Sequence, residues 1–219
     1  ALGVVNNKIY VIGGYNGSSY STAVEEYNPA TDQWTTKASM PTGRDNLAVG
    51  VVNGKIYAIG GNGGPTTVEE YDPLTNQWAT KTSMPTGRSG FAIGVVNGKV
   101  YAIGGMGSSV PPFTTVEEYD PATNQWTTKT SMPTGRWELD AGVVNGKVYA
   151  VGGTTNGGDY LTTVEEYDPT TNQWTTKAGM PTGRVALAVG VADNKIYAIG
   201  GHRTGGIELT TVEEGTVSP

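Results

Sequence analysis

Two carboxylates stand at positions where related segments of this chain carry uncharged residues. Glu138 and Asp140 follow Trp137 in the segment WELDA, residues 137–141. If this segment is a β-strand, both carboxylates share one of its faces and lie about 7 Å apart. A pair of this kind suits the binding of a polar partner or acid–base chemistry on a glycoside. Two carboxylates are too few for a closed calcium site unless water and backbone oxygens complete it.

The composition removes several other kinds of chemistry. Cysteine is absent and His202 is the single histidine, so neither a thiolate nor a multi-histidine metal site is expected. The formal charge is −6, and the 14 Lys and Arg residues are spread along the chain. Nucleic-acid binders carry clustered basic residues, so this class is not expected. No apolar run reaches the length of a membrane helix, and we predict no membrane insertion.

An internal repeat gives these residues their context. Gly-Gly pairs that begin at residues 13, 60, 104, 152 and 200 each end an apolar run. Trp34, Trp78, Trp126 and Trp174 each precede the next Gly-Gly pair by 26 residues. Variation in length is confined to the connection between each Gly-Gly pair and the next VEE segment. A constant framework with one variable loop is therefore expected.

Each repeat predicts four short antiparallel strands. In the third repeat these are FAIGVV (residues 91–96), KVYAIGG (99–105), TTVEEY (114–119) and WTTKTSM (126–132). Asn97-Gly98 is a strong two-residue hairpin signal, and DPATNQ (120–125) is rich in turn residues. Nothing in the repeat has a sustained helical period. Four strands in about 47 residues describe a propeller blade.

The recurring set GR, VVNGKVYAIGG, VEEYDPATNQW and TTKTSMP resembles the Kelch repeat, which has these Gly-Gly, Tyr and Trp positions. The resemblance implies an all-β propeller of four-stranded antiparallel blades, with the first strand of each blade nearest the axis. We predict a single domain over 1–219, with five Kelch-type blades near 1–40, 41–84, 85–132, 133–180 and 181–219. The last blade lacks its outer strand, and Gly215 replaces the usual Tyr. The alternative is part of a six- or seven-bladed ring.

Most of the repeated residues are predicted to be framework. The repeated Trp and Tyr residues are expected to pack within and between blades. An Arg precedes each of the last four inner strands, at positions 44, 88, 136 and 184. We interpret this Arg as structural and paired with a glutamate of VEE; anion binding is the alternative.

Function is expected where the repeats disagree. Residues 78–105 and 126–153 differ at seven positions, and five of these are contiguous: SGFAI against WELDA. This segment and the loop after Gly-Gly emerge at the same end of a four-stranded antiparallel blade. Kelch proteins similarly bind partners at this end. The predicted binding residues are Trp137, Glu138, Asp140, Asp45, Asn46, Ser89, Val185, Tyr15, Asn62, Met106, Thr154, His202 and Arg203.

Within WELDA, Leu139 occupies the position of Leu47 and Phe91 and is expected to stay in the core. Asp140 replaces an alanine, and its charge is expected to face a wet axial channel or to meet an Arg. Trp137 is expected at the rim as an anchor for a partner. The alternative is that its ring fills space left by Ala141.

The favoured function is a non-catalytic scaffold that holds a protein segment or a carbohydrate at the variable loops, with no cofactor, no metal and no catalytic residues. One alternative is assembly, with self-association through the open edge of the last blade. The other is a carboxylate-dependent glycoside enzyme. Kelch copper oxidases need Cys and several His, which this chain lacks. The localisation stays open, with an extracellular or cell-surface site favoured over the cytoplasm.

Overall fold

A computed structural model describes residues 1–107, 111–155 and 159–216 of the chain. Parts of two variable loops (108–110 and 156–158) and the last three residues therefore lie outside the described residues. The chain divides into two compact units. Unit 1 comprises Ala1–Ser89 and Asp120–Trp126, and unit 2 comprises Gly90–Tyr119 and Thr127–Pro219.

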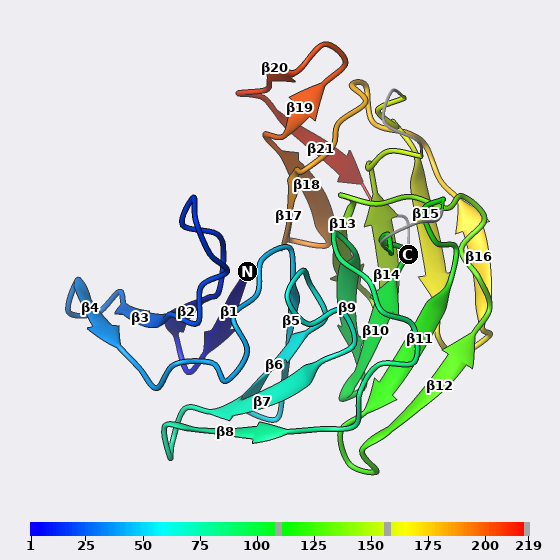
Figure 1. The fold of residues 1–219 in the computed structure, drawn as a ribbon. Coiled ribbons are helices and arrows are strands. Elements are labelled where there is room, and N and C mark those ends of the chain that lie inside the picture. The colour runs from blue at the N-terminus through cyan, green and yellow to red at the C-terminus, as the bar shows by residue number, and fades with distance from the viewer. Residues whose placement is uncertain (108–110, 156–158, 217–219) are drawn as a thin grey trace. The chain divides into compact units, whose positions relative to one another are not determined.

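Five antiparallel sheets follow one another along the chain, each built in sequence order (Figure 1). The first is β1 (Leu2–Val5), β2 (Lys8–Ile12), β3 (Val24–Asn28) and β4 (Gln33–Thr36), and the second is β5 (Ala48–Val52), β6 (Lys55–Ile59), β7 (Val68–Asp72) and β8 (Gln77–Thr80). The third is β9 (Ala92–Val96), β10 (Lys99–Ile103), β11 (Val116–Asp120) and β12 (Gln125–Lys129). The fourth is β13 (Asp140–Val144), β14 (Lys147–Val151), β15 (Val164–Asp168) and β16 (Gln173–Thr176).

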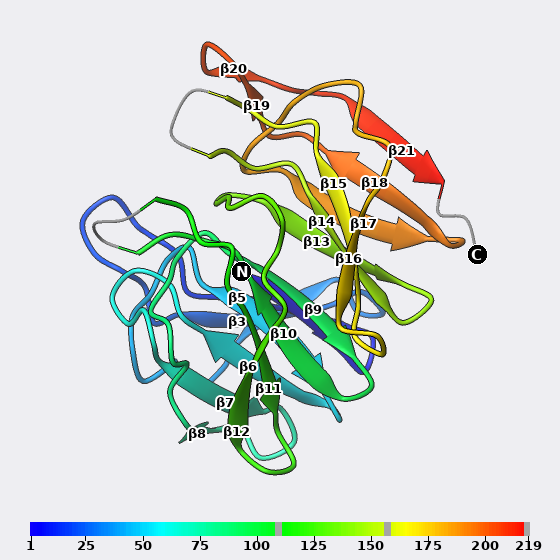
Figure 2. The same ribbon diagram turned by 90° about the vertical axis from the view of Figure 1, so that its right-hand side faces the viewer.

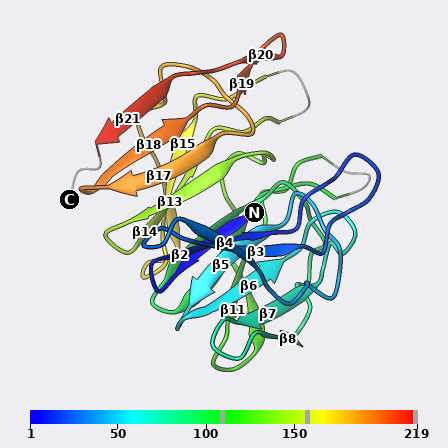
Figure 3. The ribbon, with the colours of Figure 1, turned by 90° about the vertical axis from the view of Figure 1, so that its left-hand side faces the viewer.

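The fifth sheet has three strands, β17 (Ala188–Ala192), β18 (Lys195–Ile199) and β21 (Val212–Thr216) (Figure 2). The predicted fold, a five-bladed propeller with a three-stranded last blade, is thereby confirmed. A two-stranded hairpin, β19 (His202–Arg203) and β20 (Ile207–Glu208), follows β18 and precedes β21 in the chain (Figure 3). It was not predicted, because its short strands carry no alternating apolar pattern.

The predicted hairpin turns form as the residue types require. Asn53 and Gly54 have φ of 50° and 75°, and Asn145 and Gly146 have φ of 51° and 73°. Two successive left-handed residues make a type I′ turn, which matches the twist of the strands that it joins.

Each core cluster in unit 2 is shared by consecutive blades. Val148 of β14 packs with Ala92 of β9 and Tyr101 of β10. Leu139, 5% exposed, belongs to the same cluster, as the sequence pattern predicted. A Cβ added at Gly94 would lie 2.6 Å from a methyl group of Val148, so a glycine is needed where this inner strand approaches the next blade.

A buried arginine links consecutive blades within each unit. The backbone oxygen of Arg136 accepts a hydrogen bond of 2.9 Å from the N–H of Gly105, in the preceding blade. Its guanidinium is inserted into the fourth blade. There it donates to the backbone oxygens of Ala150 and Thr163 and to Oε2 of Glu165 at 2.9 Å. Arg136 is fully buried, and burial lowers its pKa to about 10 while Glu165 opposes the shift.

The same arrangement recurs at other blade boundaries. Arg44 pairs with Glu69 at 2.6 Å in unit 1, and Arg184 pairs with Glu213 at 2.6 Å in unit 2. These pairs confirm the prediction of a framework arginine bound to a VEE glutamate.

The Gly-Gly pair is explained by this contact. A Cβ at Gly104 would lie 2.7 Å from the backbone oxygen of Arg136, which only glycine avoids.

We predict that Glu165→Gln destabilises the protein by about 3–5 kcal/mol, because it leaves the buried guanidinium of Arg136 without its counter-charge. Glu25→Gln is the matched control. Glu25 holds the same position in the first VEE segment but is exposed, so its substitution should change stability by less than about 0.5 kcal/mol. Urea denaturation measures both. Equal effects of the two substitutions would show that the buried pair is not a stabilising link.

Candidate functional site

The two variable segments of a blade meet through backbone pairing. Trp137 and Thr154 form an isolated β-bridge in unit 2, with N–H to O distances of 3.1 and 3.0 Å. Val185 and His202 form the equivalent bridge in the next blade. In unit 1, Asp45 bridges Asn62, and the Asn62 side chain also donates to Asp45 Oδ1 at 2.8 Å. In these three blades the residue after the Arg therefore lies beside the residue after Gly-Gly, which agrees with the prediction that both segments emerge at the same end of a blade.

The remaining predicted residues differ in exposure. Tyr15 is exposed and lies with its ring centroid 5.9 Å from that of Tyr20, an aromatic pair within one loop whose second member the sequence reasoning missed. Asn46 and Arg203 are exposed, whereas Ser89 and Met106 are half-buried. The side chains of Val185 and Thr154 are buried, at 3% and 2% exposure, so they face the protein interior.

Glu138 does not lie in a strand, which corrects the expected geometry of the two carboxylates. Its φ is +50°, and β13 begins only at Asp140. The equivalent residues Asn46, Gly90 and Ala186 have φ of 46°, 58° and 51°. The turn thus imposes a left-handed residue before the inner strand of each of the last four blades. Asn and Gly accept this conformation readily, whereas for Glu it costs about 1–2 kcal/mol.

Backbone hydrogen bonds join these left-handed residues across three blades of unit 2. The N–H of Glu138 donates to the oxygen of Gly90 at 2.7 Å, and the oxygen of Glu138 accepts from the N–H of Ala186 at 2.9 Å. The backbone of Glu138 is therefore framework, although its side chain differs from blade to blade.

Trp137 lies over a glycine of the preceding blade. Its ring atom Cε3 is 3.3 Å from the place that a Cβ of Gly90 would occupy. The Trp137 side chain is half-buried. One side of the residue therefore packs on the framework, and part of it reaches the surface.

Among the described residues, no Arg or other cation pairs with Asp140, contrary to one expectation. Its Oδ1 accepts the N–H of Ala141 at 2.8 Å, and its Oδ2 accepts the N–H of Val189 at 2.7 Å. The second bond joins inner strands β13 and β17. Burial raises the pKa of Asp140 to about 6, and the two N–H groups oppose that shift. Asp140 is thus a structural bridge between blades, and both of its oxygens are engaged.

The Glu138 carboxylate accepts no hydrogen bond from any residue that the structure describes. Burial raises its pKa, and the nearby His202 acts in the opposite direction. The imidazole of His202 comes from the hairpin β19–β20 of the last blade, so Glu138 and His202 bring two blades together at this site.

Neither a metal centre nor a membrane helix is found in the described part of the chain. Residues 1–107, 111–155 and 159–216 contain no cluster of three or more His, Asp or Glu side chains that could hold a metal ion. The same residues include no helix that is long and apolar enough to cross a membrane.

We predict that Asp140 makes stability fall as pH rises. The folded state retains the Asp140 proton up to pH of about 6, whereas the unfolded chain loses it near the ordinary aspartate pKa of 3.8. The protonated form therefore stabilises the fold below pH of about 4, and this contribution is lost as pH rises through about 6. The stability of the native protein relative to Asp140→Asn should fall by about 2–3 kcal/mol between pH 4 and pH 7.

Urea denaturation of both proteins across this pH range measures the difference, since effects of other groups cancel. A difference that does not change with pH would contradict the assignment.

Comparison with known proteins places this geometry in a family. The solved structure of YjhT superposes with a TM-score of 0.86 over 99% of this chain and 80% of the other, at 21% sequence identity. At this low sequence identity, the similarity to YjhT shows a shared fold alone. A search of curated proteins finds no match. The family model of the Kelch motif matches residues 1–41, 43–85, 87–133 and 140–181. The chain therefore belongs to the Kelch-repeat family.

Proposed function

We propose that the protein is a non-catalytic binding module that holds a protein segment at the loop end of its fourth and fifth blades. Kelch propellers generally mediate protein interactions, which supports a binding scaffold. The finer assignment rests on Trp137 and Glu138.

One observation carries the proposal: these two residues occupy framework backbone positions with side chains that the framework does not require. The equivalent positions hold Ser89 and Gly90 in one blade and Val185 and Ala186 in another. The backbone bonds of Glu138 to the neighbouring blades do not involve its side chain. A large aromatic ring and a strained acidic residue at such positions are therefore explained by contact with a partner.

The chemistry of the site favours a basic segment as the partner. Trp137 presents a half-buried ring, and tryptophan is a frequent energetic centre of interfaces. Glu138 supplies a carboxylate that a lysine or arginine would pair with, and the protein has a net charge of −6. The hydroxyl of Thr154 is buried beside Trp137 and has no hydrogen-bond partner among the described residues. A carbohydrate is the alternative ligand.

Glycoside hydrolysis is the alternative chemistry, and the carboxylates support it poorly. Asp140 has both oxygens bonded to backbone N–H groups, so it is not available as a second catalytic carboxylate. A two-carboxylate mechanism needs an acid and a base or nucleophile on opposite sides of the scissile bond.

Selection of binders from a random peptide library tests the proposal. We expect peptides that carry Lys or Arg, and we expect their affinity to fall at least tenfold in Trp137→Ala and in Glu138→Gln. Trp34→Ala is the matched control, because Trp34 is an exposed tryptophan on outer strand β4. It should bind the selected peptides as the native protein does.

Two results would contradict the proposal. Selected peptides that bind Trp137→Ala and Glu138→Gln with native affinity would show that the site lies elsewhere. Binding to a glycan array, or hydrolysis of aryl glycosides that is lost in Glu138→Gln, would replace the protein segment by a carbohydrate ligand or substrate.

A further inference from the structure

Outer strands are fastened to the preceding blade by a repeated pair of hydrogen bonds. In unit 1, Trp78 Nε1 donates to the oxygen of Ala38 at 2.9 Å, and the N–H of Ala38 donates to Asn76 Oδ1 at 2.9 Å. In unit 2, Trp174 and Asn172 hold the backbone of Thr130 in the same way, both at 2.9 Å. The motif Asn-x-Trp of one blade therefore hydrogen-bonds both backbone groups of one residue in the blade before it.

A tyrosine of the third strand completes this contact. The hydroxyl of Tyr167 donates to Asn172 Oδ1 at 2.8 Å, and its ring centroid lies 5.1 Å from that of Trp174. The same ring lies 5.7 Å from Tyr101 of the preceding blade. Tyr71 in unit 1 makes the corresponding contacts with Asn76, Trp78 and Tyr10.

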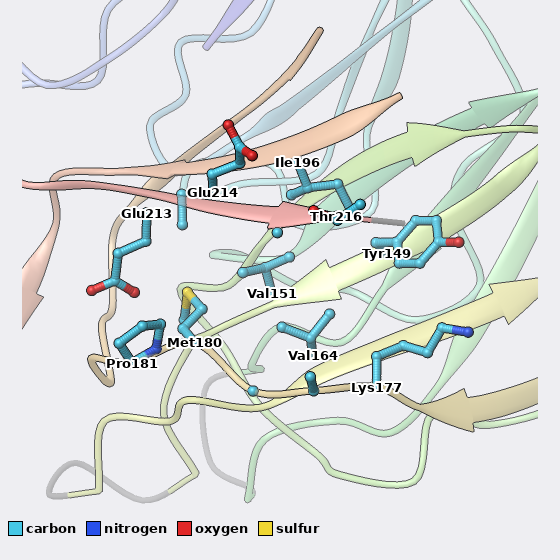
Figure 4. A pocket seen from close by; sticks show the side chains of 14 residues that line it. Tyr149, Val151, Val164, Lys177, Met180, Pro181, Ile196, Glu213, Glu214 and Thr216 are labelled. Atoms are coloured by element: carbon cyan, nitrogen blue, oxygen red, sulfur yellow. The ribbon is translucent and has the colours of Figure 1, made fainter. Parts of the chain in front are cut away.

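The last blade lacks this set of contacts, and a pocket lies in its place. Gly215 occupies the position of Tyr167, and Ala178 occupies the position of Thr130. Among the described residues, no Asn or Trp side chain bonds the backbone of Ala178. A cavity of about 350 Å³ lies here, lined among others by Tyr149, Val151 and Ile196 (Figure 4). Such a volume is typical of binding pockets.

The exposure of the repeated methionine also shows that the boundary between the fourth and fifth blades lacks contacts. Met40, Met84 and Met132 are each 1% exposed, whereas the equivalent Met180 is half-buried and lines the pocket. The pocket is therefore an apolar surface that other blade boundaries cover.

The pocket adjoins an edge of β21 that no described strand pairs with. In the fourth blade, the oxygen of Val164 accepts the N–H of Lys177 beyond the end of β16. Val212 is the equivalent residue in β21, so Val212, Glu214 and Thr216 direct their backbone groups towards the open edge. Such an edge is a template for one more antiparallel strand.

The charged residues at this edge indicate which side chain an added strand would carry. In complete blades, the lysine three residues after the Trp pairs with the second glutamate of VEE: Lys177 with Glu166 at 2.8 Å and Lys81 with Glu70 at 3.1 Å. Glu214 is the equivalent glutamate, and it is exposed next to Lys195. A lysine at the same spacing in an added strand would reach it.

We infer that the last blade accepts an extended segment of a second polypeptide with the pattern Asn-x-Trp-x-x-Lys. The segment adds to β21 as a fourth, antiparallel strand. Its tryptophan lies opposite Gly215, as Trp174 lies opposite Tyr167, and covers the pocket beside Tyr149. An aromatic side chain opposite a strand glycine shields the backbone that the glycine exposes.

The segments with this Trp spacing, β4, β8, β12 and β16, are each paired within their own sheets. The site is separate from Trp137 and Glu138, so the inference does not rest on the proposed function.

The test uses a fluorescein-labelled peptide with the sequence of residues 168–180, DPTTNQWTTKAGM. Fluorescence anisotropy should show saturable binding to the native protein, and replacement of the peptide's Trp by Ala should weaken binding at least tenfold. Glu214→Pro should abolish binding, since it removes an N–H from the open edge without removing a bond to β18. Glu214→Gln keeps the edge and should weaken binding only severalfold.

Trp137→Ala should bind this peptide with native affinity, which separates the two sites. The inference is overturned if the Trp and Ala peptides bind equally, or if Glu214→Pro binds as Glu214→Gln does.

Amide hydrogen exchange measured on the native protein gives a second test, which does not depend on whether a substituted protein folds. The bound peptide should slow exchange at Glu214 and Thr216 at least tenfold and leave the Trp137 segment unchanged. Unchanged exchange at Glu214 and Thr216 under saturating peptide would equally overturn the inference.

Discussion

The buried arginine between consecutive blades is the interaction on which the other features depend. Its backbone oxygen holds the Gly-Gly pair of one blade, and its guanidinium holds a glutamate and carbonyl oxygens of the next. Burying a guanidinium is less costly when its donors are paired, and Nη1 and Nη2 of Arg136 bond Ala150, Thr163 and Glu165. The surrounding backbone therefore has little freedom. This requirement accounts for the near-identity of the repeats around Gly-Gly, VEE and GR.

The residues directly after the arginine are joined to neighbouring segments by backbone hydrogen bonds that do not depend on the side chain. Glu138 is joined to its neighbours through its N–H and its oxygen, and Trp137 pairs with Thr154 in the same way. Side chains at these positions can therefore change without loss of the fold. The last blade departs from the framework differently, since Gly215 removes a side chain and leaves a pocket and an open strand edge. Binding is assigned to both places for the same reason: the repeated contacts do not use them.

Much of the fold could be predicted because its determinants are local. Asn-Gly turns, apolar inner strands and the constant spacing from Trp to Gly-Gly all lie within one repeat, and Arg136 needed only the nearby VEE segment as a partner. Asp140 was predicted poorly because its second hydrogen bond goes to Val189, 49 residues away in the next blade. The left-handed turn at Glu138 left a signal that was missed: Asn46 and Gly90, at the equivalent positions, are residue types that favour positive φ.

Single alanine substitutions at the five positions 136–140, each measured by urea denaturation at pH 7, test most directly whether framework and site are separate. The account predicts large losses of stability, about 3 kcal/mol or more, for Arg136→Ala and about 2–5 kcal/mol for Leu139→Ala. Trp137→Ala and Glu138→Ala should each lose less than about 1.5 kcal/mol, because their framework contacts are made by the backbone. Losses at Trp137 and Glu138 as large as that at Arg136 would contradict the separation of framework from site.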